Sequence, residues 1–273
     1  MIKDNKKTTA VALKPSQAIL EALRNEFPAE QGFTRTYLPR LGMFSQDVME
    51  GKGKAMKVVT EAGTFFTDRQ SEEETENAEG KKVKEFVKEE IGDSIEGIII
   101  FQRRQLRHYN ESTEEYTSSP IFDFDTDIIP LFLGKKEVAR GTAAELKARS
   151  EFQVTKEGKT KSTLEENKIL YVIYKDEIFQ MNLRGSSMYS YKGYAKELHA
   201  NEQSPSMVLT KFTSEACEKG DIEWNKMIFA VKRDLDGKEC KEVYEKVQEI
   251  KAGITEEREF FASQNEAKSA ILF

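Results

Sequence analysis

The chain has 273 residues, of which 38% are hydrophobic and 33% charged, and its formal net charge is −6 at pH 7. This length suits one elaborated domain or two small ones with a buried core, and no apolar run approaches the roughly 20 residues that cross a bilayer. Two cysteines argue against a disulfide scaffold and a cysteine-based zinc site. The first residues lack the apolar segment of a signal peptide, so we expect a cytoplasmic protein.

In chain order, the first predicted element is an amphipathic helix over 15–28, within an N-terminal helical arm that we assign to residues 1–30. Two short strand pieces are expected over 57–69. The acidic residues 70–93 predict a surface insert with a short helix. A strong strand candidate follows over 97–109, where a β-branched run gives way to alternating polar and aromatic residues.

The second half of the chain is more regular. Thr142 and Glu145 have the spacing of a capping box and predict a helix start. Polar residues 153–168 predict a loop. Hydrophobic periodicity then predicts a hairpin, a helix, a second hairpin and a closing helix, over residues 169–184, 186–199, 206–235 and 238–254.

Strands, a hairpin, a helix, another hairpin and a closing helix occur in this order in a five-stranded OB barrel. We therefore predict an α+β, β-rich fold, an elaborated OB-like barrel with flanking helices and long inserts. The core domain is expected over 31–254, with inserts at about 70–93 and 110–168, and a C-terminal tail over 255–273.

The strand candidate 97–109 carries an unusual set of side chains on one face. Side chains alternate in a strand, so Phe101, Arg103, Gln105, Arg107 and Tyr109 fall together. Rings on which bases stack, with guanidinium groups between them for phosphates, are typical of single-stranded nucleic-acid binding. The alternative places Phe101 in the core and the arginines in ion pairs with the acidic inserts.

Cations beside aromatic residues recur elsewhere in the chain. The cations predicted to contact phosphates are Arg35, Arg40, Lys52, Lys54, Arg103, Arg107, Lys192 and Lys226. The rings predicted to stack on bases are Tyr37, Phe101, Tyr109, Tyr189 and Trp224. The apolar tip SAILF, ending in Phe273, suits docking into a pocket of a partner protein, or packing back on this protein.

Three alternating carboxylates, Asp123, Asp125 and Asp127, are compatible with a second function. Convergent carboxylates around a metal ion cleave phosphodiesters, so a metal-dependent nuclease is one alternative. A non-enzymatic structural or host-interaction protein is another. The two histidines lie in no recognisable triad, and GKGK at 51–54 lacks the Ser or Thr of a phosphate-binding P-loop. For the nucleic-acid-binding function described above, we therefore expect no catalytic residue, no metal and no cofactor.

The basic-aromatic strands, the OB-like order and the terminal phenylalanine resemble the single-stranded DNA-binding proteins of bacteriophages and bacteria. The resemblance covers roughly residues 35–254 and rests on the phrases KVVTEAGTFF, YTSSPIFD, NLRGSSMYSYKGYAKEL and IEWNKMIF. It implies a protein that coats single-stranded DNA in replication or recombination without strong sequence preference, in the host cytoplasm if phage-encoded. Replication or recombination proteins reached through the tail, and self-association, are the implied partners. Two departures are Lys268, which interrupts a thin acidic tail, and inserts longer than those of the small bacterial proteins.

Overall fold

A computed structural model describes residues 38–50, 56–76, 82–110, 115–134, 136–150, 152–154 and 160–252. The first strands are β1 (Arg40–Met43), β2 (Val48–Glu50), β3 (Lys57–Thr60), β4 (Phe65–Glu76), β5 (Lys82–Gly92), β6 (Ser94–Asn110) and β7 (Glu115–Ser118). The later ones are β8 (Ile129–Leu133), β9 (Lys136–Gly141), β10 (Phe152–Val154), β11 (Thr160–Ser162), β12 (Glu165–Tyr174), β13 (Glu177–Leu183), β14 (Val208–Lys219) and β15 (Ile222–Asp234). The helices are α2 (Ala143–Arg149), α3 (Gly185–Ala200), a 3-10 turn (Pro205–Met207) and a helix over 237–252.

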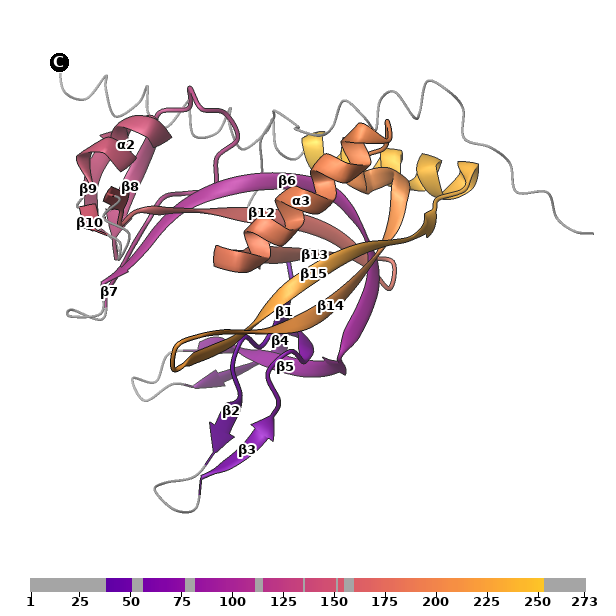
Figure 1. Ribbon diagram of the computed structural model, residues 1–273, viewed down its shortest axis with the longest axis horizontal. Coiled ribbons are helices and arrows are strands. Elements are labelled where there is room, and N and C mark those ends of the chain that lie inside the picture. Colours follow the sequence, from indigo (N-terminus) through magenta and orange to yellow (C-terminus); the bar gives the residue numbers. More distant parts are fainter. Residues whose placement is uncertain are drawn as a thin grey trace, which may run out of the picture.

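One large sheet holds most of the strands (Figure 1), in the order β5-β4-β1-β13-β12-β6-β7-β8-β9. β14 adds to β6 and pairs with β15, while β2–β3 and β10–β11 are separate two-stranded ribbons. β1 runs parallel to β13, and the other neighbouring strands are antiparallel. No sheet closes on itself within the described ranges. The many strands and few helices confirm the β-rich α+β class. The OB-like barrel is not confirmed, because it requires a closed sheet.

The centre of the sheet is buried on both faces, which explains the continuous apolar run ILYVIY in β12. Leu170 and Val172 belong to a core beneath α3 and the β14–β15 hairpin. Ile169 and Tyr171 point the other way, into a core covered by the helix 237–252. The predicted hairpin and both helices of this half of the chain are confirmed.

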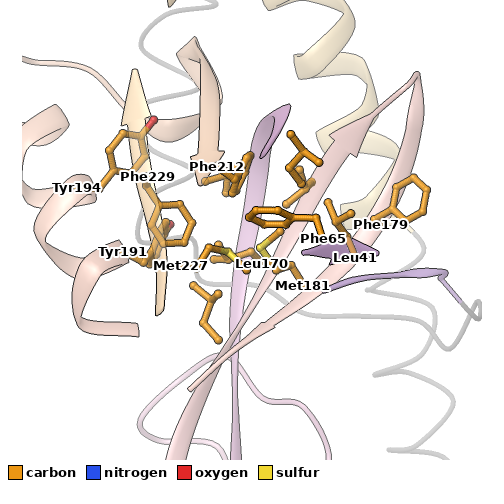
Figure 2. Packing of buried hydrophobic residues seen from close by; sticks show 14 of the residues in the cluster. Leu41, Phe65, Leu170, Phe179, Met181, Tyr191, Tyr194, Phe212, Met227 and Phe229 are labelled. Carbon is orange, nitrogen blue, oxygen red and sulfur yellow. The ribbon is translucent and has the colours of Figure 1, made fainter. Parts of the chain in front are cut away.

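Aromatic rings dominate the first of these cores, as Figure 2 shows. The Phe229 ring of β15 meets Tyr191 and Phe212 edge to face, with centroids 5.4 Å apart in both pairs. Tyr194 stacks on the same ring at 5.9 Å. The buried side chains of α3 are Tyr191, Tyr194 and Leu198, and the two tyrosines pack against Phe229 of β15.

The long strand β6 pairs with β14, β12 and β7, and Gly97 lies where it passes from β14 to β12. Residues 98–107 pair with β12, and residues 94–97 pair with β14. A Cβ at Gly97 would lie 2.8 Å from both the Ile173 carbonyl oxygen and the Val172 Cγ1. Only glycine lets the backbones approach this closely without a shift.

The acidic stretch 70–93, predicted as a surface insert with a short helix, is instead mostly strand. It supplies the end of β4 and the whole of β5, which pair in antiparallel register from Phe65↔Gly92 to Glu76↔Lys82. Pairing with a neighbouring strand overrides the helical preference of its Lys and Glu residues. The predicted polar loop 153–168 likewise contains the β10–β11 ribbon and the start of β12.

The described residues within 110–168 form the short strands β7 to β11 and the helix α2, and β7, β8 and β9 extend the main sheet. The helix α2 begins with the predicted capping box of Thr142 and Glu145. The arm 1–30 and the tail 255–273 lie outside the described residues. In the part of the chain described here, no helix combines the length and apolar character needed to cross a membrane.

Candidate nucleic-acid interface

Of the residues predicted to bind nucleic acid or a partner, five lie outside the described ranges. These are Arg35, Tyr37, Lys52, Lys54 and Phe273. The others are distributed over β1, β6, α3 and β15, and only some of them face solvent.

Phe101 does not offer a ring to a base. Its side chain is 0% exposed and meets Tyr171 edge to face, with centroids 5.8 Å apart. It packs in the core under the helix 237–252. The prediction of a stacking role for Phe101 is therefore wrong for this fold, and the alternative reading of the residue as core is correct.

Arg103 is buried as well, against the acidic loop between β7 and β8. Its Nε and Nη2 donate to the two carboxylate oxygens of Asp123 at 2.5 and 2.8 Å, and the side chains are 5% and 1% exposed. A guanidinium enclosed in this way is not available to a phosphate. The predicted phosphate contact is therefore wrong, and the alternative of an ion pair with the insert is what the structure shows.

The neighbouring Arg104 binds the same loop from the opposite face of β6. Its Nη1 donates to Asp125 at 2.5 Å, its Nη2 to the Asp123 carbonyl at 2.6 Å, and its guanidinium lies 5.0 Å from the Phe122 ring centroid. The hydrogen bond and charge of Arg104 hold the pKa of Asp125 below its usual value.

The third carboxylate of this loop, Asp127, accepts hydrogen bonds from the backbone N–H groups of Asp123 and Phe124, at 3.1 and 2.9 Å. The three aspartates thus bind two arginines and the loop's own backbone. Across the described ranges, no three His, Cys, Asp or Glu side chains group closely enough to hold a metal ion. The carboxylate site required by the nuclease alternative is not assembled at these aspartates.

The last residues of the same strand are partly open to solvent. Tyr109 pairs across the strands with Tyr116 of β7, and their ring centroids are 4.6 Å apart with an interplanar angle of 37°. The Arg107 guanidinium lies 4.0 Å from the centroid of the Tyr116 ring. The tyrosines are 43% and 44% exposed. We call Arg107, Tyr109 and Tyr116 the β6–β7 stack.

On α3, Tyr189 and Lys192 form a second exposed pair. They are three residues apart and therefore neighbours on the helix surface. The Lys192 Nζ lies 5.5 Å from the centroid of the Tyr189 ring, and Tyr189 is 67% exposed, the largest exposed fraction among the predicted rings described. Both side chains are open to solvent, as the prediction requires.

Trp224 and Lys226 of β15 are more constrained. The indole Nε1 donates to the Ser186 Oγ at 3.0 Å, and the Lys226 Nζ pairs with Glu215 at 2.6 Å. This hydrogen bond with Glu215 raises the pKa of Lys226. Trp224 also lines a cavity of about 740 Å³ whose other lining residues include Asp47, Glu218 and Glu223. Carboxylates beside this ring repel the phosphates of a nucleic-acid backbone and so disfavour its binding there.

Arg40 belongs to a further set of rings and cations that sequence reasoning only partly found. Its guanidinium lies 5.8 Å from the Phe86 ring, while the Lys88 Nζ lies 5.6 and 5.2 Å from Phe44 and Phe66. The rings of Phe44 and Phe66 are 4.4 Å apart. Lys88 and Phe66 were missed because their proximity depends on the register of β4 with β5 and β1.

The predicted residues that lie within the described ranges therefore do not form one continuous groove. Those that face solvent lie in separate sets on β6–β7, on α3 and on β1–β4–β5. In the main sheet, β13 and β12 separate β1, β4 and β5 from β6 and β7. Comparison with known proteins adds no relative: no family model, no curated protein and no solved structure matches the chain.

Proposed function

We propose that this protein binds single-stranded DNA without strong sequence preference, as a non-enzymatic coating protein of replication or recombination. The observation that carries the proposal is the β6–β7 stack, in which Arg107, Tyr116 and Tyr109 form an array of one partly buried cation and two exposed rings. A base extends such an array through its π face, and the guanidinium lies near enough to attract the phosphate beside it.

The two other sets of rings and cations support the same function. Lys192 lies beside Tyr189, and Lys88 beside Phe44 and Phe66, so a ring and a cation are again adjacent. Separate small contact sets suit a strand that winds over a surface. Because every base has a π face, contacts of this kind discriminate little between sequences.

Fluorescence anisotropy of a labelled oligothymidine, titrated with the full chain over a range of salt concentrations, tests the proposal. We expect binding whose log Kd varies linearly with log salt, since cations that neutralise phosphates release counterions. Absence of binding at low salt would contradict the proposal and favour the structural or host-interaction alternative. Shortening of the oligonucleotide only when Mg²⁺ is added would favour the nuclease.

A further inference from the structure

Two cations lie directly opposite each other near the middle of the main sheet. Lys168 of β12 and Arg104 of β6 are cross-strand partners, so their side chains leave the same face of the sheet. Like charges in this position destabilise a sheet unless something neutralises them. The Arg104 guanidinium donates to Asp125 and to the Asp123 carbonyl. These acceptors therefore neutralise Arg104 and not the Lys168 ammonium.

The surroundings of Lys168 place it beside α3. Its Nζ donates to the Gln102 Oε1 at 3.3 Å and lies 6.0 Å from the centroid of the Tyr191 ring. Lys192, the residue after Tyr191, is exposed on the same helix. Within the described ranges, neither Lys168 nor Lys192 forms an ion pair.

The electrostatics agree with this geometry. Burial lowers the pKa of the Lys168 ammonium, Glu166 raises it, and Lys192 and Arg104 lower it further. Glu166 itself pairs with Lys147 of α2 at 2.6 Å. A half-buried ammonium with two cations near it, and with Glu166 engaged by Lys147, is stabilised by an added anion.

We propose that Lys168 and Lys192 together bind one backbone phosphate of a single strand, in the angle between α3 and β12, with Tyr189 beside Lys192 receiving an adjacent base. The proposal rests on the proposed function and adds a site to it. Lys168 belongs to no basic run and carries no aromatic neighbour in sequence. Only the strand register and the position of α3 place its ammonium beside Tyr191, the residue before Lys192.

The test measures the dependence of log Kd on log salt for a labelled oligothymidine, with wild type and four variants, of which Lys168→Arg keeps the charge. Lys168→Met keeps the apolar stem and removes the charge, and Lys192→Gln removes the second cation. Lys238→Gln is the matched control, because Lys238 is exposed on the helix 237–252 on the other face of the sheet. Each lost phosphate contact lowers the slope by about 0.7 for single strands.

We expect Lys168→Met and Lys192→Gln each to lose about that much slope, Lys238→Gln to keep the wild-type slope, and Lys168→Arg to keep most of it. Removing a desolvated charge is also expected to raise the Tm of the free Lys168→Met protein, which shows that the variant is folded. A wild-type slope in Lys168→Met would overturn the site while the proposed function stands. Wild-type protein that does not bind the oligonucleotide would overturn both.

Discussion

Arg103 donates two hydrogen bonds to the Asp123 carboxylate, and both side chains are almost completely buried. Arg103 lies in a stretch of β6 with three arginines and no acid, from 98 to 110, so it looks from its neighbours like part of a basic surface. The compensating carboxylate comes from a loop twenty residues later. Local charge excess is thus cancelled by tertiary pairing.

Arg103→Met is expected to lower the free energy of unfolding by about 3–5 kcal/mol, since it leaves the buried Asp123 carboxylate without its principal cation. Urea unfolding at pH 7 measures the loss. Arg140→Met is the control, because Arg140 pairs with Glu137 in an exposed position and such pairs contribute about 1 kcal/mol or less. The double variant Arg103→Met with Asp123→Leu should recover much of the loss, and equal losses in Arg103→Met and Arg140→Met would refute a buried pair.

Two tyrosines of α3 differ in one hydrogen bond and give a matched pair of variants. The Tyr194 hydroxyl bonds to the Thr210 Oγ1 at 2.7 Å, and burial raises the pKa of Tyr194 to about 12. Within the described part of the chain, the buried Tyr191 hydroxyl has no hydrogen-bond partner, and burial raises its pKa strongly.

We expect Tyr191→Phe to leave stability unchanged or to raise it by up to about 1 kcal/mol, because it removes an unsatisfied buried hydroxyl. Tyr194→Phe should lower stability by about 1 kcal/mol, because it leaves the Thr210 hydroxyl unpaired. Thermal unfolding of the two variants compares them directly. If Tyr191→Phe proved the more damaging change, the Tyr191 hydroxyl would have to have a partner.

Glu239 makes the start of the last helix sensitive to acid. It binds Arg233 through both carboxylate oxygens at 2.6 and 2.7 Å and accepts from the Asp236 N–H at 2.9 Å. The hydrogen bond from Arg233 is the main reason that the pKa of Glu239 lies below its usual value of 4.5. A depressed pKa in the folded state means that ionised Glu239 stabilises the fold.

This stabilisation is fully present above the ordinary value of 4.5 and is lost as the pH falls through the lower folded value. Glu239→Gln should therefore be less stable than wild type at pH 7, with the difference shrinking as the pH is lowered toward the folded pKa. Chemical unfolding at several pH values from neutral to acid measures the difference. A constant difference over that range would mean that Glu239 does not act through its charge.

The sequence predicts the second half of the fold well because its signals are local. The hairpin of β12 and β13, the helix α3 and the capping box of Thr142 each follow from periodicity or from spacings of a few residues. The strand nature of 70–93 depends on pairing between β4 and β5, which short-range preference does not encode.

The same distinction separates the candidate site residues. Exposure of Tyr109 and Tyr189 agrees with the prediction, whereas Phe101 is covered by a helix that begins more than 130 residues later. Tyr116 begins the phrase YTSSPIFD, but no sequence pattern indicates that it is a site residue. Its place beside Tyr109 follows from the register of β6 with β7, which has no signature in the sequence.

Tyr116 lies at the centre of the β6–β7 stack, so Tyr116→Ala is expected to weaken oligothymidine binding by about 5- to 150-fold, the loss of roughly one stacked base. Because the ring carries no charge, the salt dependence of Kd should stay as in wild type.

Arg107→Gln is expected to change mainly the salt dependence. The affinity at high salt should change less than in Tyr116→Ala, and the slope of log Kd against log salt should fall by about 0.7. Ile222→Ala, which shortens another exposed apolar side chain, serves as the control for both and should bind like wild type. Anisotropy titrations at several salt concentrations separate these effects, and a Tyr116→Ala protein that binds as tightly as Ile222→Ala would show that bases do not stack here.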